Sequence, residues 1–271
     1  MAESSRRPDA PLARAMALVS DVLAERPAGL LTDFDGTLSP IVADPALSRL
    51  VDGAGGALAA LAERLAVVAV VTGRAPLDAR RMTEVPGLLI AGNHGTEWLE
   101  PDAGQAIAAP AASSVRADVD SALAGLPELT GVTVEHKGMS ATVHYRNAPD
   151  PDRALTAILE GLGALEGRRI VLRHGRMSVE LRPIGFGDKG SAARAIVERF
   201  GLRGVVVMGD DLTDLDMFRV VAELRAEHRI RGAIIGIGGA DADVPASVVE
   251  ASDVVLADPA EAAALLVAVS R

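Results

Sequence analysis

Residues 29–37 of the chain read GLLTDFDGT, an apolar run that ends in two acidic residues, a glycine and a threonine. The run itself is typical of a buried strand, and Asp33 and Asp35 follow it directly. Side chains two positions apart in an extended segment point to the same side, so we expect these carboxylates to lie close together. They would repel each other unless a cation or a shared proton intervenes, and Mg²⁺ suits such hard oxygen ligands. The alternative interpretation is a solvated turn at the end of a strand.

Similar apolar runs recur at residues 66–71, 88–90 and 205–208, and each ends in a cluster of polar and glycine residues. Further strands are expected at 233–237 and 254–256, with a first helix over 12–23. Apolar runs that alternate with helices predict an α/β fold, a doubly wound, mostly parallel Rossmann-like core with helices on both faces. In such sheets the ligand crevice lies beyond the carboxyl ends of the strands, where these polar clusters would meet.

The pattern changes between residues 107 and 183, where helix-like and strand-like stretches follow the order α-β-β-α-β-β. We expect a smaller inserted α+β cap domain over 107–183, with residues 1–106 and 184–271 forming the core. The last two strands of the insert would join through a tight turn at His174-Gly175.

Two of the polar clusters offer groups that bind phosphate. Thr72 follows the second apolar run, and Arg74 is placed to reach a substrate. The alternative for Thr72 is a helix N-cap. Lys189 precedes an Ala-rich helix predicted over 191–200, where a lysine opposes the helix dipole unless an anion lies nearby. Its alternative is a solvated lysine in a loop.

Residues 209–214 read GDDLTD and bring Asp210, Asp211 and Asp214 together after a buried strand. Such a density of negative charge requires a metal or a lysine to offset it, which favours a metal site. Residues 92–98 read GNHGTEW, and their His94 and Glu97 are candidates for contacts with substrate hydroxyls. The alternative there is a core tryptophan beside a satisfied histidine.

The composition limits the classes of function. The chain has 271 residues, no cysteine and a formal net charge of −10, from 27 basic and 37 acidic residues. A negative surface repels phosphate backbones, which argues against nucleic acid as a partner. No apolar stretch is long enough to span a bilayer, and the polar residues 1–11 lack the apolar centre of a secretory signal. We therefore expect a soluble, cytoplasmic protein with no membrane partner.

The four phosphate-site elements, in this order, resemble those of the haloacid dehalogenase-like phosphatases. The elements are residues 33–37 (DFDGT), Thr72, Lys189 and residues 209–214. The resemblance implies that Asp33 attacks phosphorus and that Asp35 is the general acid and base. Thr72 and Lys189 would bind the phosphoryl oxygens. Mg²⁺ would be held by the Asp33 carboxylate, the Asp35 carbonyl and Asp210, with Asp214 or Asp211 in support.

A finer resemblance is to the trehalose-6-phosphate phosphatases. It rests on residues 33–40 (DFDGTLSP), 94–98 (HGTEW), 135–138 (EHKG) with 144–146 (HYR), 179–183 (VELRP) and 209–214. It covers roughly residues 30–266 and implies Mg²⁺-dependent hydrolysis of trehalose 6-phosphate through an aspartyl-phosphate. This is the final step of trehalose biosynthesis and implies functional coupling to a trehalose-phosphate synthase. One departure is Leu215, where the family usually has glutamate.

By the same analogy, four cap residues would bind sugar hydroxyls: Glu135, Lys137, Arg146 and Glu180. Their alternative is a solvated face of a sheet. Only these residues select the sugar, so phosphates of sucrose, glucosylglycerol or a mannosylglycerate-type sugar stay open as substrates. A third possibility is a non-catalytic sugar-phosphate sensor, which would be expected to lose Asp33 or Asp35.

Overall fold

The computed structural model describes residues 10–42, 44–109, 112–137, 140–162, 170–175, 177–183, 187–238 and 244–271. The chain divides into two compact units. Unit 1 comprises the described residues of Met1–Ile107 and Asp188–Arg271, and unit 2 those of Ala108–Gly187. An insertion therefore separates two segments of chain that fold together.

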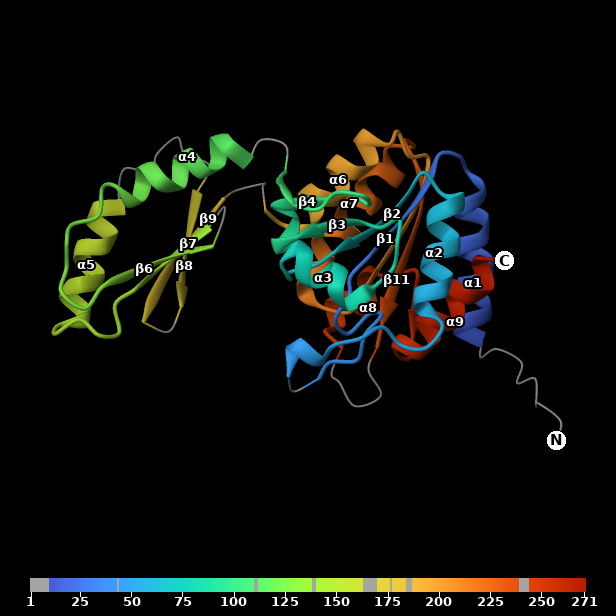
Figure 1. Cartoon of the computed structure of the whole chain (residues 1–271), viewed down its shortest axis with the longest axis horizontal. Helices are drawn as coiled ribbons and strands as arrows, with labels where there is room; N and C mark the ends of the chain where they lie inside the picture. Colours follow the sequence, from blue (N-terminus) through green and yellow to red (C-terminus); the bar gives the residue numbers. More distant parts are fainter. Residues whose placement is uncertain are drawn as a thin grey trace. The chain divides into compact units, whose positions relative to one another are not determined.

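An eight-stranded sheet, in the order β12-β11-β10-β1-β2-β3-β4-β5, forms the centre of unit 1 (Figure 1). Its strands are β1 (Ala28–Thr32), β2 (Val67–Val71), β3 (Leu89–Gly92), β4 (Glu97–Leu99), β5 (Ile107–Ala108), β10 (Gly204–Gly209), β11 (Arg231–Ile237) and β12 (Val254–Leu256). Neighbouring strands pair in parallel along the sheet from β12 through β11, β10, β1 and β2 to β3. Strand β4 pairs antiparallel to β3. The predicted doubly wound, mostly parallel sheet is thus confirmed.

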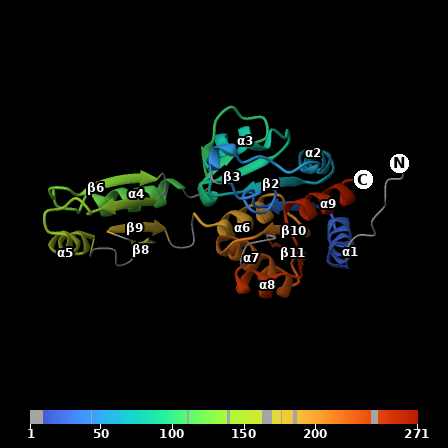
Figure 2. The same ribbon diagram turned by 90° about the horizontal axis from the view of Figure 1, so that it is seen from below.

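Helices cover both faces of this sheet, as Figure 2 shows. The helices of unit 1 are α1 (Ala10–Ala24), α2 (Ala54–Arg64), α3 (Pro76–Thr83), α6 (Lys189–Arg199), α7 (Leu215–Ala226), α8 (Ala246–Ala251) and α9 (Pro259–Val269), with short 3-10 helices η1 (Pro45–Leu47), η2 (Asn93–Gly95) and η3 (Leu212–Asp214). Helices α1, α2 and α9 lie on one face, and α6, α7 and α8 lie on the other. Because both faces are covered, β1 and β2 are buried at every position, which explains their continuous apolar runs.

The register of the sheet brings the polar clusters to one edge. Thr32, the last residue of β1, pairs with Met208 of β10 and with Val70 of β2. The next residue, Asp33, donates its backbone N–H to the Met208 carbonyl at 3.0 Å. The segments that follow β1, β2 and β10 therefore begin at nearly the same level, at the carboxyl ends of three neighbouring parallel strands.

Unit 2 is a four-stranded antiparallel sheet with two helices. The sheet has the order β6-β7-β9-β8, with β6 (Thr133–Lys137), β7 (Ser140–His144), β8 (Ile170–Gly175) and β9 (Ser178–Pro183), and the helices are α4 (Ala112–Leu123) and α5 (Pro151–Leu162). Apolar side chains on alternate positions of β7 and β9 bury against Ile158 of α5. The turn predicted at His174-Gly175 is wrong: both residues belong to β8, and Gly175 pairs with Ser178.

Within the described part of the chain, no helix is both long and apolar enough to cross a lipid bilayer.

Replacing Leu58 by alanine should destabilise unit 1. Leu58 lies on α2, is fully buried and belongs to the core between the helices and the sheet. Loss of a buried leucine side chain leaves a cavity and costs about 2–5 kcal/mol of unfolding free energy. The matched control is Leu77→Ala on α3, whose side chain is 47% exposed. Urea unfolding followed by circular dichroism should show a clearly lower midpoint for Leu58→Ala alone; equal midpoints would contradict the assigned core.

Candidate active site

Three strand ends supply the residues of the candidate site. Asp33 follows β1, Thr72 follows β2, and Asp210 follows β10. Asp33 and Thr72 are almost completely buried, with 5% and 1% of their surface exposed. Buried polar groups need partners, so the contacts of these side chains decide what the site can do.

Lys189 is a buried cation that joins two of the acids. Its Nζ lies 2.8 Å from Asp33 Oδ1 and 2.7 Å from Asp214 Oδ1. Lys189 is the first residue of α6, and Asp188 caps that helix by accepting the backbone N–H of Ser191 at 2.6 Å. The expected alternative of a solvated loop lysine is wrong, because only 3% of Lys189 is exposed. The two carboxylates supply the counter-charge that its place at a helix N-terminus requires.

Asp214 organises the loop after β10. Its Oδ2 accepts the backbone N–H groups of Asp210 and Asp211, each at 3.0 Å, while its Oδ1 accepts from Lys189. Gly209 makes room for this side chain, since a Cβ there would lie 2.4 Å from Asp214 Cγ. Both oxygens of the fully buried Asp214 therefore already have donors.

Burial destabilises the ionised forms of Asp33 and Asp210. It raises the pKa of Asp33 from 3.8 to about 7, with Asp214 adding to the rise and Lys189 opposing it. It also raises the pKa of Asp210 to about 6, against the opposing hydrogen bond from Thr37. Burial alone would lower the pKa of Lys189, but Asp33 and Asp214 outweigh it and raise that pKa above its ordinary value. The cluster thus carries more negative charge than Lys189 alone offsets.

The cluster fits a divalent cation. Asp33, Asp210 and Asp214 each place a carboxylate oxygen within 4.8 Å of the others, and these hard oxygen donors suit Mg²⁺. Gly36 has a φ of 81°, and a Cβ there would lie 2.0 Å from Asp210 Oδ2. Glycine at this position therefore keeps space for the Asp210 carboxylate. Because both Asp214 oxygens are engaged, Asp33 and Asp210 are better placed for direct contact with the cation, and Asp214 for support.

Thr72 and Arg74 both lie in the loop between β2 and α3. Helix α3 begins at Pro76 with Ala75 as its N-cap, so Thr72 is no helix cap; its Oγ1 accepts the Arg74 backbone N–H at 3.2 Å. The Arg74 side chain reaches Asp35, with Nε 2.6 Å from Oδ2 and Nη2 2.6 Å from Oδ1. The structure thus brings Arg74 to an acid of the site.

The segment after β3 places its tryptophan in the core, and the predicted substrate contacts of His94 and Glu97 stay a prediction. Glu97 accepts from Asn93 Nδ2 at 2.6 Å, and the buried Trp98 donates from Nε1 to the Gly95 carbonyl at 3.2 Å. The His94 backbone N–H donates to the Thr72 carbonyl at 2.9 Å. The tryptophan is therefore structural, and His94 lies beside the phosphate-binding candidate Thr72.

In unit 2, the cap candidates lie on or beside the sheet. Glu135 of β6 is directly opposite Thr142 of β7, and Thr142 is directly opposite Glu180 of β9, so the three share one face. Lys137 is the last residue of β6, and the exposed Arg146 follows β7. This face lies opposite the one that packs on the helices.

Two further contacts on that face extend the polar row. His144 Nε2 lies 2.9 Å from Glu135 Oε2, and Arg173 of β8 is directly opposite Glu180. The buried hydroxyl of Thr142 has no partner among the described residues. The face therefore offers charged and hydroxyl groups in a row across four strands.

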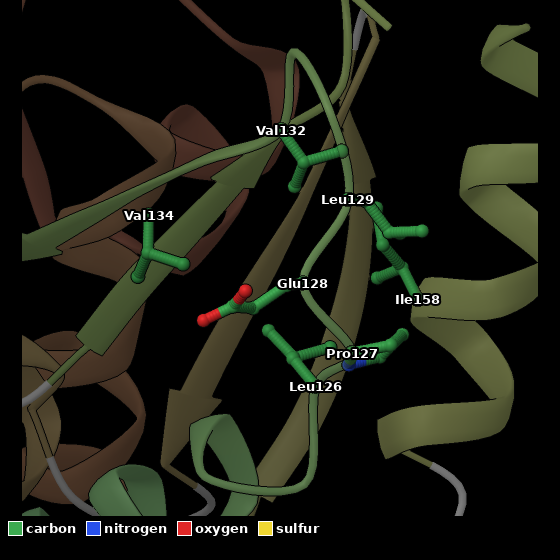
Figure 3. Close-up of a pocket in the computed structure, with 7 residues that line it drawn as sticks. All are labelled: Leu126, Pro127, Glu128, Leu129, Val132, Val134 and Ile158. Carbon is green, nitrogen blue, oxygen red and sulfur yellow. The ribbon is translucent and has the colours of Figure 1, made fainter.

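Unit 2 also contains a small, mainly apolar pocket of about 200 Å³ (Figure 3). It is lined by Leu126, Pro127, Glu128, Leu129, Val132, Val134 and Ile158. None of these is a candidate site residue, and the apolar lining does not suit a sugar phosphate.

Two hydroxyl groups contact the acids of the site and were not among the predicted site residues. Thr37 Oγ1 donates to Asp210 Oδ1 at 2.7 Å, and Ser48 Oγ donates to Asp35 Oδ1 at 3.1 Å. Thr37 belongs to the first motif, which is a usable signal, although nothing in the motif indicates its partner. Ser48 lies in an irregular segment after η1 and has no motif around it.

Solved structures identify the class of fold. Aspergillus fumigatus trehalose-6-phosphate phosphatase is 24% identical with a TM-score of 0.69, over 94% of this chain and 97% of that one. A haloacid dehalogenase-like hydrolase from Bacteroides thetaiotaomicron is 14% identical with a TM-score of 0.53, over 89% and 98%. The chain therefore has the haloacid dehalogenase-like fold.

Sequence comparison then identifies the family. The model of the trehalose-phosphatase family matches residues 31–235, and the chain belongs to that family. A Mycobacterium avium protein named trehalose-phosphate phosphatase is 38% identical over 229 residues. A Mycobacterium tuberculosis protein named an uncharacterized glycosyl hydrolase is 46% identical over 207 residues. The match covers 80% and 72% of this chain, but only 56% and 15% of those two relatives.

Replacing Asp210 by asparagine should stabilise the metal-free protein above about pH 6. The folded state binds the Asp210 proton more tightly than the unfolded chain, because its pKa is raised from 3.8 to about 6. Stability is therefore lost as the pH rises through this window, and asparagine avoids the loss while still accepting from Thr37. We expect a gain on the order of 2 kcal/mol near neutral pH and none near pH 4.

The measurement is urea unfolding in EDTA across this range. The control is Asp211→Asn, which removes the same charge from the exposed neighbour. A gain that is equal at both ends of the pH range, or equal in the control, would contradict the assigned cost of the buried charge.

Proposed function

We propose that the chain hydrolyses trehalose 6-phosphate to trehalose and phosphate through an aspartyl-phosphate on Asp33. The observation that carries the proposal is the buried contact of Lys189 with Asp33 at the end of the central strand β1. This contact holds a carboxylate beside an acidic cluster, in a chain of the trehalose-phosphatase family. A non-catalytic sensor would have no use for a nucleophile held in this way.

In the first step an Asp33 oxygen attacks phosphorus, and the bond from phosphorus to the sugar oxygen breaks. Lys189 contacts Asp33 and, with Thr72, would bind the phosphoryl oxygens. Asp35 gives its proton to the departing sugar oxygen. A bound Mg²⁺, contacting Asp33, the Asp35 carbonyl and Asp210, would neutralise charge on the phosphoryl group.

In the second step Asp35 takes a proton from a water molecule as the water oxygen attacks phosphorus. The bond between phosphorus and Asp33 breaks, phosphate is released, and the Asp33 carboxylate is restored. Asp35 is better suited to this exchange than Asp33, because 36% of its side chain is exposed against 8%. In this mechanism Asp33 is therefore the nucleophile and Asp35 the proton carrier.

Unit 2 is proposed as the sugar-recognising cap. Glu135 and Glu180 share the open face of its sheet with Thr142, and Lys137 and Arg146 follow at the strand ends. Carboxylates and hydroxyls in a row suit a neutral ligand that is rich in hydroxyl groups, since each hydroxyl both donates and accepts. Closure of a cap would also exclude bulk water during the first step.

The runner-up keeps the chemistry and changes the sugar to sucrose, glucosylglycerol or a mannosylglycerate-type compound. Trehalose 6-phosphate is preferred because of the family to which the chain belongs. On that substrate the reaction would complete trehalose biosynthesis, after a trehalose-phosphate synthase.

A panel of sugar phosphates tests the proposed substrate. Phosphate release from trehalose 6-phosphate should exceed that from sucrose, glucosylglycerol and glucose phosphates by at least about tenfold in kcat/KM, because cap contacts discriminate by roughly 1–3 kcal/mol. Asp33→Asn serves as the background control, with no release and unchanged circular dichroism. Comparable rates across the panel would overturn the choice of sugar, and full activity of Asp33→Asn would overturn the nucleophile.

Removal of divalent cations should stop turnover. Without a cation, Asp33, Asp210 and Asp214 carry more negative charge than Lys189 offsets, which disfavours binding of an anionic phosphate. EDTA should lower the rate at least about 100-fold. Added Mg²⁺ should restore it in the original protein and far less in Asp210→Asn. A rate that is insensitive to EDTA would refute the metal site.

A further inference from the structure

The Asp35 carboxylate is held by two side chains from other segments of the chain. Arg74 donates from Nε to Oδ2 and from Nη2 to Oδ1, both at 2.6 Å, and Ser48 donates to Oδ1 at 3.1 Å. Arg74 Nη2 also donates to Ser48 Oγ at 2.8 Å, which closes the group into a ring of hydrogen bonds. We propose that Arg74 and Ser48 are positioning residues that orient Asp35 so that its Oδ2 carries the transferred proton.

Asp35 needs such support because its own turn fixes only the backbone. The Gly36 N–H donates to the Ser39 carbonyl at 2.7 Å, and the Leu38 and Ser39 N–H groups donate to the Phe34 carbonyl at 2.9 Å. None of these bonds involves the Asp35 carboxylate. The Asp35 side chain is 36% exposed. Without Arg74 and Ser48 this side chain would be free to take other rotamers.

Arg74 is itself held on several sides. Its guanidinium lies over the Phe34 ring, 5.6 Å from the centroid. Its backbone N–H donates to Thr72 Oγ1 at 3.2 Å, and its carbonyl accepts the Asn93 N–H at 2.8 Å. Gly92 permits this approach, because a Cβ there would lie 2.6 Å from the Arg74 carbonyl oxygen. The guanidinium is therefore presented to Asp35 as a fixed fork, which a lysine could not reproduce.

The hydrogen bonds distinguish the two oxygens of Asp35. Oδ1 accepts from both Arg74 and Ser48, whereas Oδ2 accepts from Arg74 alone among the described residues. Each carboxylate oxygen has two lone pairs, so Oδ2 keeps one for a proton. On the proposed function, Oδ2–H protonates the sugar oxygen as its bond to phosphorus breaks and that from Asp33 forms. Oδ2 then regains a proton from the water that displaces Asp33 from phosphorus.

This assignment separates Arg74 from the groups that bind the substrate. A residue that binds the phosphoryl group or the sugar should affect KM, whereas a residue that orients the general acid should affect kcat. The leaving group provides a second distinction. p-Nitrophenolate leaves as a stable anion and needs little help from an acid, unlike the alkoxide of a sugar.

The test compares Arg74→Gln, Ser48→Ala, Asp35→Asn and the double variant Arg74→Gln/Asp35→Asn. On trehalose 6-phosphate, Arg74→Gln should lower kcat roughly 30-fold or more with KM within about twofold, and Ser48→Ala should lower kcat about three- to tenfold. In a pre-steady-state burst with p-nitrophenyl phosphate, the first-step rates of Arg74→Gln and Ser48→Ala should stay within about threefold of the original protein's rate. The double variant should match Asp35→Asn, because Arg74 acts through Asp35.

Arg81→Gln is the matched control, since Arg81 lies on α3 with 75% of its side chain exposed. It should behave as the original protein, and circular dichroism of every variant should show the folded state. If Arg74→Gln misfolds, the same measurements on Ser48→Ala with the two substrates test the inference.

Three results would overturn the inference: a raised KM with unchanged kcat, an equal loss in the p-nitrophenyl phosphate burst, or an added loss in the double variant. The proposed function fails separately, if the original protein releases no phosphate from trehalose 6-phosphate. In that case p-nitrophenyl phosphate still reports on Arg74 and Asp35.

Discussion

The site depends on one buried ammonium group placed between two buried carboxylates. Lys189 contacts Asp33 and Asp214 at 2.8 and 2.7 Å, and all three are nearly or fully buried. Removing Lys189 would leave two buried carboxylates without their counter-charge, which costs far more than an unpaired charge in water. Asp33 follows β1, whereas Lys189 begins α6 and Asp214 ends η3, so this contact also joins the two segments of chain that the insertion separates.

The two acids of the first motif are distinguished by the cations that hold them. Asp33 faces inward to Lys189, which is fixed by the start of α6, while Asp35 faces Arg74, which is fixed by the loop after β2. Burial raises the pKa of Asp33 to about 7, so its ionised form depends on nearby positive charge. Asp35 is more exposed, and its side chain is held through hydrogen bonds from Arg74 and Ser48. These different surroundings support the proposed roles of Asp33 as a buried nucleophile and Asp35 as an accessible proton carrier.

The glycines of the site act by leaving space, and their effect depends on neighbours that are distant in sequence. A Cβ on Gly36 would occupy the place of Asp210 Oδ2, and a Cβ on Gly209 would collide with the Asp214 carboxylate. Gly36 additionally takes a φ of 81°, which other residues adopt at a cost. The acidic cluster can therefore be as compact as it is only because two chain segments lack side chains at these points.

The apolar runs are enough to predict the parallel sheet, because buried strands need continuous apolar residues. The motifs that follow these runs are enough to predict that Asp33, Thr72, Lys189 and Asp210 lie near one edge of that sheet. The sequence by itself could not determine which partner each side chain takes, since hydrogen bonds and ion pairs depend on distances of a few tenths of an ångström. Only the tertiary structure shows that Arg74 and Ser48 both donate to the Asp35 carboxylate and that Lys189 is buried between two acids. Ser48 had no periodicity or motif to mark it, because its role comes from where an irregular loop folds.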